Sequence, residues 1–144
     1  MLKGIPRILS PDLLFIIAQM GHGDELVLAD ANFPAASIAK RLVRADGHGV
    51  EPILEALLQL FPLDHFIEQP AAVMRRVDQP DQAAPIWNEY QRRLDRSEGR
   101  PVGMERVERF AFYERARQAF AVVATGETAL YGNLIIKKGV IVAQ

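Results

Sequence analysis

The 144-residue chain has no cysteine and only three histidines. The absence of cysteine excludes disulfides, thiolate nucleophiles and sulfur-ligated metal centres, and it fits a reducing compartment, so we expect a cytoplasmic protein. The histidines are His22, His48 and His65, and no two of them stand at ligand spacing on one predicted element. The pattern therefore argues against a histidine-rich metal site, and we expect no bound metal.

No excess of one charge and no long apolar run is present either. Seventeen Lys and Arg residues face eighteen Asp and Glu residues, for a formal net charge of −1. This balance gives nucleic acid binding no electrostatic support, and we expect no nucleic-acid partner. The longest uncharged run, 13–23, falls short of the ~18 residues needed to cross a bilayer, so we expect no membrane partner. Pro6, Pro11 and Asp12 interrupt the beginning of the chain, which is not the pattern of a secretory signal peptide.

Helical and strand-like patterns alternate along the sequence. Ser10 is a suitable helix cap, and Leu13, Ile16, Ile17 and Met20 then recur at helical spacing as one buried stripe. Further predicted helices cover 52–61, a polar surface helix within 78–99, and 110–119; predicted strands cover 25–29, 41–45, 71–77, 120–125, 133–137 and 140–142. This alternation predicts one α/β layered domain over 1–144, with helices on both sides of a sheet.

The familiar chemical motifs are absent. Gly21-His22-Gly23 does not qualify as a dinucleotide-binding loop, because Leu26 stands in place of the third glycine and the segment precedes a strand. There is no phosphate-loop lysine pattern, no Gly-x-Ser-x-Gly elbow and no His-Glu-x-x-His pair. Chemistry must therefore be sought in less specific residues.

His22 and Asp30 flank the first predicted strand. His22, between two glycines, is either a solvated loop residue or a general acid/base, because histidine titrates nearest to neutrality. Asp30 is either a turn former or an acceptor for ligand hydroxyls, since open α/β sheets bind ligands beyond the carboxyl ends of their strands. His48 and His65 have no partner pattern, and we interpret both as solvated or structural.

Two later segments also offer polar groups. Arg109 is either a solvated charge or a ligand-binding cation. The segment Tyr131-Gly132-Asn133 reads as a turn into a strand, yet it combines a hydroxyl, an amide and a bare backbone, the mixed donors and acceptors that sugar hydroxyls need.

Blocks distributed over nearly the whole chain resemble the fucose mutarotase and D-ribose pyranase family. Their order and spacing together carry the resemblance. The blocks are 1–5 (MLKGI), 8–11 (ILSP), 20–25 (MGHGDE), 30–35 (DANFPA), 44–47 (RADG), 109–116 (RFAFYERA), 125–127 (TGE), 131–133 (YGN) and 137–140 (KKGV).

The resemblance implies a three-layer α/β/α domain that assembles into homo-oligomeric rings, commonly decamers, with the sugar site near subunit contacts. It implies that no cofactor is needed and that His22 is the catalytic acid/base. The residues it implies for sugar binding are Asp30, Arg109, Tyr113, Tyr131, Gly132 and Asn133.

The implied reaction is interconversion of the α and β anomers of L-fucose by ring opening and closing. Two alternatives remain: conversion of D-ribose between pyranose and furanose forms, and non-catalytic sugar binding beside an uptake system. Fucose-type relatives often carry histidines near 32 and 36, where this chain has Asn32 and Ala36, so the sugar preference is open. The segment 68–106 shows little similarity, and we expect its Trp87 in a variable lid or interface.

Overall fold

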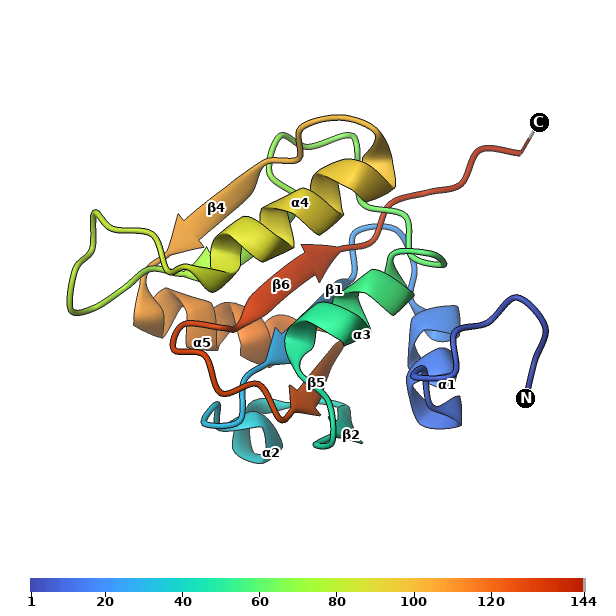
Figure 1. Ribbon diagram of the computed structural model, residues 1–144, viewed down its shortest axis with the longest axis horizontal. Helices are drawn as coiled ribbons and strands as arrows, with labels where there is room; N and C mark the ends of the chain where they lie inside the picture. Colours follow the sequence, from blue (N-terminus) through green and yellow to red (C-terminus); the bar gives the residue numbers. More distant parts are fainter. Residues whose placement is uncertain (144) are drawn as a thin grey trace.

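A six-stranded mixed sheet runs through the middle of the molecule (Figure 1). The structure is a computed structural model and describes residues 1–143. The strands are β1 (Glu25–Ala29), β2 (Leu42–Ala45), β3 (Ala71–Met74), β4 (Met104–Val107), β5 (Ala121–Thr125) and β6 (Leu134–Lys137). Their order is β2-β5-β1-β6-β3-β4. Strand β6 runs antiparallel to β1 and β3, and the other neighbouring pairs are parallel.

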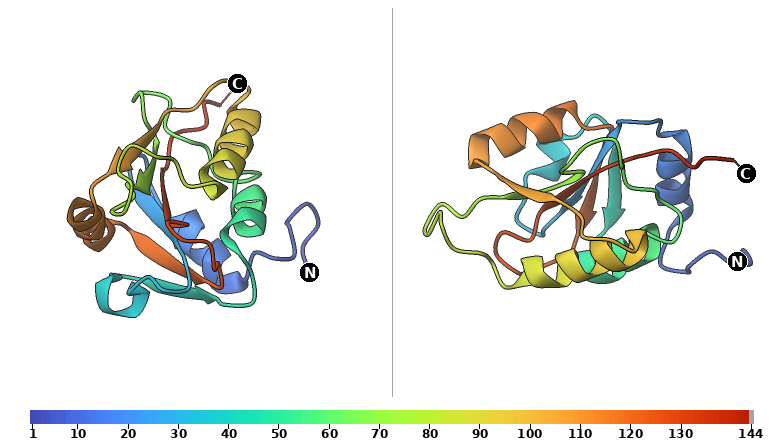
Figure 2. Two further views of the ribbon diagram at one scale, coloured as in Figure 1. Left: turned by 60° about the vertical axis from the view of Figure 1, so that its left-hand side comes forward. Right: turned by 90° about the horizontal axis from the view of Figure 1, so that it is seen from above.

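Helices cover both faces of this sheet. They are α1 (Pro11–Gln19), α2 (Ala35–Ile38), α3 (Val50–Leu57), α4 (Ile86–Glu98) and α5 (Arg109–Gln118). Figure 2 shows α3 and α4 side by side on one face and α2 with α5 on the other. The predicted three-layer α/β/α architecture is therefore confirmed.

The strands are apolar on both sides because both faces are covered. Side chains of a strand alternate between faces. In β1, Leu26 and Leu28 pack in the core with α1, α3 and α4, whereas Val27 and Ala29 pack in the core with α2 and α5. Burial on both faces explains why these strands are short continuous apolar runs in the sequence.

Most predicted elements are present within a few residues of their expected bounds. The Ser10 side chain caps α1, where its Oγ accepts a hydrogen bond from the Leu13 N–H at 3.1 Å. The predicted helix 52–61 begins earlier, at Val50, and ends at Leu57; Phe61 follows in a buried turn whose N–H bonds to the Leu57 carbonyl. The predicted strand 71–77 ends at Met74.

One predicted strand is absent, and two elements of the structure were not predicted. No strand forms at 140–142, where Ile141 and Val142 are exposed, and the sheet instead contains β4, an edge strand that the sequence did not predict. The surface helix predicted within 78–99 is present as α4, which lies on the outside of the sheet and packs Trp87, Tyr90 and Leu94 against it. The one-turn helix α2 was also unpredicted.

None of the helices in the described part of the chain is long and apolar enough to cross a membrane.

Candidate active site

A pocket of about 480 Å³ opens at one end of the sheet. Asp30 follows the carboxyl end of β1, Met74 ends β3, Asn133 precedes the amino end of the antiparallel β6, and Arg109 begins α5 shortly after β4. The directions of these strands bring all four residues to the same end of the sheet. This is the place where open α/β sheets bind ligands.

Asp30 is held at the pocket wall by its neighbours. Its N–H donates to the Asn133 Oδ1 at 2.7 Å, and its own Oδ1 accepts from the Asn32 N–H at 3.0 Å. Burial raises the pKa of Asp30, although hydrogen bonds from the Asn32 and Phe33 backbone oppose this effect. The buried Asn133 amide thus fixes the end of β1 and orients the Asp30 carboxyl group.

Arg109 lines the same pocket without a carboxylate partner in the described residues. Its Nε is buried and makes no hydrogen bond within 1–143, and its Cζ lies 4.6 Å from the centre of the Phe110 ring. The neighbouring Glu108 does not pair with it, because the Glu108 carboxylate caps α5 by accepting from the Phe110 and Ala111 N–H groups. The guanidinium therefore retains donors for a ligand.

Two tyrosines complete the polar lining. Tyr113 lies one turn after Arg109 on α5, with its ring 5.6 Å from that of Phe33. Tyr131 lies in the loop before β6, and its hydroxyl accepts from the Val77 N–H at 3.0 Å. Both tyrosines line the pocket that also contains Asp30.

Two side chains of α4 form hydrogen bonds with the backbone of the loop before β6. The Trp87 Nε1–H donates to the Tyr131 carbonyl at 2.9 Å, and the Tyr90 hydroxyl donates to the Gly132 carbonyl at 2.7 Å. Trp87 is buried, so the expectation that it lies in a lid or interface was wrong for the single chain. Nothing in the sequence paired α4 with 131–133, because the two segments are distant in the chain and meet only across the sheet.

His22 lies at the opposite end of the sheet from the pocket. It precedes the amino end of β1, whereas Asp30 follows the carboxyl end, and the five residues of β1 alone span roughly 16 Å. The Gly23 N–H bonds to the Lys138 carbonyl beyond the end of β6, which fixes this loop at the far edge. The fold therefore brings together Asp30, Arg109, Tyr113, Tyr131 and Asn133 and leaves His22 apart from them.

His22 has a carboxylate partner that sequence reasoning missed. Its Nε2 lies 3.2 Å from the Asp64 Oδ1; the His22 side chain is 46% exposed and that of Asp64 only 5%. Burial acts to raise the pKa of Asp64, but the hydrogen bonds from the Phe66 N–H and from His22 outweigh it, and the pKa of Asp64 is lowered. An ionised Asp64 favours the tautomer with the proton on Nε2, which leaves His22 Nδ1 able to accept a proton.

The other predicted histidines have different surroundings. His65 is exposed and stacks on the Phe66 ring, 4.2 Å between ring centres, beside the His22 pair. His48 is exposed in the loop after β2.

The two positions at which fucose-type relatives often carry histidine both lie beside Asp30. Asn32 lines the 480 Å³ pocket, and Ala36 lines an adjoining pocket of about 500 Å³ that also contains Asp30.

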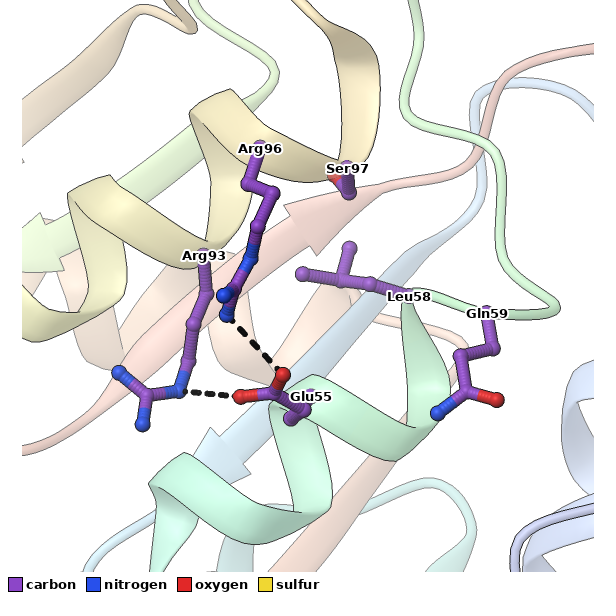
Figure 3. A pocket seen from close by; sticks show the side chains of 6 residues that line it. All are labelled: Glu55, Leu58, Gln59, Arg93, Arg96 and Ser97. Atoms are coloured by element: carbon purple, nitrogen blue, oxygen red, sulfur yellow. Dashed lines mark hydrogen bonds and ion pairs between the residues drawn. The ribbon is translucent and has the colours of Figure 1, made fainter.

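A small cavity of about 150 Å³ lies between α3 and α4 on the outer helical layer. Figure 3 shows Arg93 and Arg96 directed toward Glu55, and each forms an ion pair with it at 3.0 Å. These ion pairs link α4 to α3 and neutralise the charges beside the cavity. We therefore interpret the cavity as part of the contact between the two helices.

Comparisons with known proteins agree with one another. A sequence model described as the RbsD / FucU transport protein family matches residues 3–141. The fucose mutarotase of Homo sapiens is 56% identical, with 97% of this chain and 94% of the relative covered, and that of Danio rerio is 59% identical over the same shares. The crystal structure of the Streptococcus pneumoniae fucose mutarotase in complex with L-fucose superposes with a TM-score of 0.92 at 45% identity, covering 98% of this chain and all of that one.

Proposed function

Because the chain belongs to the RbsD / FucU transport protein family, we propose that it is a cofactor-independent isomerase that interconverts the α and β anomers of L-fucose. One observation carries the proposal: the pocket at the carboxyl end of β1 combines a carboxylate, an unpaired guanidinium and two phenol hydroxyls. Relatives named fucose mutarotase, at 56% and 59% identity, support the assignment of the sugar.

The pocket suits a monosaccharide in size and chemistry. Its volume of about 480 Å³ lies within the usual range for small-molecule sites. The Asp30 carboxylate accepts hydrogen bonds from sugar hydroxyls, and the Arg109 guanidinium donates to sugar oxygens. Phe33, Met74 and Leu130 supply an apolar wall suited to the carbon face and methyl group of a 6-deoxy sugar.

The reaction needs only proton transfers. The anomeric hydroxyl loses its proton to a base, the bond between C1 and the ring oxygen breaks, and the ring oxygen gains a proton to give the open aldehyde. Rotation about C1–C2 and the reverse steps close the ring with the other configuration. A positioned acid/base contributes about 10²–10⁴-fold to such transfers.

We assign this proton exchange to His22, with Asp64 as its orienting partner. The ionised Asp64 accepts from Nε2 and stabilises the imidazolium that forms when Nδ1 takes a proton. The Asp64 carboxylate has one further donor, the Phe66 N–H at 3.0 Å, which holds it in place. The pair is thus suited to take a proton and return it.

His22 reaches a sugar in this pocket only from another copy of the chain, because β1 separates the two within one copy. We therefore propose a homo-oligomer in which the His22 loop of one subunit closes the pocket of its neighbour. The repeated head-to-tail contact that this requires closes naturally into a ring, and we propose the decamer implied by the resemblance. Light scattering that finds a stable 16 kDa monomer would contradict this assembly.

Magnetisation-transfer NMR on L-fucose, D-ribose and D-galactose tests the proposed activity. We expect added protein to accelerate anomer exchange of L-fucose. Acceleration of D-ribose pyranose–furanose exchange alone would support the ribose alternative. Binding of L-fucose without any acceleration would support a non-catalytic sugar-binding protein.

We also propose a cytoplasmic location. A chain without cysteine suits a compartment in which disulfides do not form. Fractionation of the producing organism should place the protein with cytoplasmic markers, and recovery outside the cytoplasm would contradict this part of the proposal.

A further inference from the structure

Helix α4 makes two hydrogen bonds to the loop that carries the pocket tyrosine. Trp87 Nε1 donates to the Tyr131 carbonyl at 2.9 Å, and one turn later the Tyr90 hydroxyl donates to the Gly132 carbonyl at 2.7 Å. Both donors are almost fully buried, with 2% and 0% of their surface exposed. Two successive carbonyls of the loop are therefore held by side chains that do not line the sugar pocket.

The backbone held in this way has an unfavourable conformation. Tyr131 has φ 58°, and among the described residues it is the one non-glycine residue with positive φ. Side chains rarely adopt this left-handed region, and such residues persist where the surroundings hold them. Gly132 is confined as well, since a Cβ there would lie 2.9 Å from the Ala129 carbonyl oxygen and 3.5 Å from the Tyr90 hydroxyl.

This conformation decides where the Tyr131 side chain points. Its hydroxyl accepts from the Val77 N–H at 3.0 Å, next to Asp78, and both of these residues line the sugar pocket. The following residue, Asn133, orients the amide of Asp30. A change of the loop backbone would therefore displace a hydroxyl and loosen the support of a carboxylate in the same pocket.

We propose that Trp87 and Tyr90 are positioning residues that set the Tyr131–Gly132 backbone in the conformation required for sugar binding. This inference rests on the proposed function for its sugar. Neither residue touches substrate; each acts through the loop carbonyl to which it donates.

Two variants remove one donor each and keep an aromatic ring: Tyr90→Phe and Trp87→Phe. Each leaves a carbonyl without its partner, and loss of one such hydrogen bond corresponds to about a tenfold effect. We expect KM for L-fucose to rise about tenfold in each variant, with a smaller change in kcat, because His22 and Asp64 are untouched.

Leu94→Val is the matched control. Leu94 is fully buried on the same helix but makes no side-chain hydrogen bond to the loop. We expect this variant to lower Tm while KM stays at the wild-type value. If the two aromatic variants lower Tm and also leave KM unchanged, their role is merely structural and the proposal is overturned.

The positioning role can also be tested if the proposed mutarotase activity is absent. If the wild-type protein binds L-fucose without accelerating exchange, the dissociation constants of the same variants replace KM in the test. If it does not bind L-fucose at all, the crystal structure of Tyr90→Phe decides: a Tyr131 that leaves the left-handed region supports positioning, and an unchanged Tyr131 refutes it.

Discussion

The two ends of strand β1 present different chemistry. At the carboxyl end, Asp30 lines a pocket together with an unpaired arginine, Arg109, and the pKa of Asp30 is raised by burial. At the amino end, half-exposed His22 pairs with Asp64, and there the carboxyl pKa is lowered. One end is equipped to bind a polar ligand, and the other to move a proton.

The two groups lie at opposite ends of β1, so under the proposed function one copy of the chain holds both halves of the site without joining them. Strand β1 is buried and lies between β5 and β6 in the sheet, so its two ends stay apart within one copy. In the function proposed above, assembly of copies is part of catalysis, because it joins the binding end of one subunit to the proton-transfer end of another.

Substitution of His22 should have the largest effect. We expect His22→Ala to reduce the catalysed rate of anomer exchange by about 10²–10⁴-fold, because the acid/base is lost, while the affinity for L-fucose changes little. Magnetisation-transfer NMR and calorimetry measure the two quantities. His48→Ala, which removes an exposed loop histidine, is the control and should retain full activity; an equal loss there would refute a specific role for His22.

Substitution of Arg109 should affect binding at the other end. A hydrogen bond to a charged group contributes about 1.5–3 kcal/mol, so Arg109→Ala should weaken L-fucose binding about 10–100-fold. Calorimetry provides the measurement. Arg117→Ala, at the exposed far end of the same helix, should bind like the wild type. Wild-type affinity in Arg109→Ala would remove this residue from the site.

Substitution of Asn133 should act on stability. Its buried Oδ1 is the acceptor for the Asp30 N–H, so Asn133→Ala leaves a donor unsatisfied and should lower the free energy of unfolding by about 1–3 kcal/mol. Urea denaturation measures the change. Asn32→Ala should change it by less than about 0.5 kcal/mol, since Asn32 is exposed and contributes only its backbone N–H. Equal losses would show that the Asn133 hydrogen bond has no special role.

The smallest effect concerns acid pH and Asp64. Because the pKa of Asp64 is lowered in the folded protein, its ionised form adds stability above the pKa of about 3.9 of an unfolded aspartate. That contribution disappears as the pH falls through the folded value. Asp64→Asn should therefore be less stable than the wild type at pH 7, and the difference should shrink below about pH 4. A difference independent of pH would contradict the lowered pKa of Asp64.

The sequence predicted the central strands of the sheet better than its edge strand β4. Strands β1 and β5 are apolar runs because both of their faces are covered, and so they were recognised. Edge strand β4 was missed because its residues are half-exposed or exposed, with Glu105 and Arg106 in its centre. Helix α4 was predicted as a surface helix, but the burial of Trp87 on its inner face was not.

The pocket was predictable in part. Asp30 was placed at the carboxyl end of a strand from the sequence, and the structure adds Arg109 and Asn133 to the same edge. The sequence placed His22 and Asp30 on either side of one predicted strand, but only the structure showed how far apart this leaves them within one copy. The pairing of His22 with Asp64 was not predicted, because the two residues meet only through the return of the chain beside β6.

Mixing two impaired variants, one at each end of β1, tests most directly whether the site is shared between subunits. The variants His22→Ala and Arg109→Ala are given different affinity tags and co-expressed. In the mixed rings, about a quarter of the sites should combine an intact pocket with an intact His22 from the neighbouring subunit. With L-fucose below KM, rings purified by both tags should recover about a quarter of the wild-type rate. Mixed rings no more active than their parents would contradict a site shared between subunits.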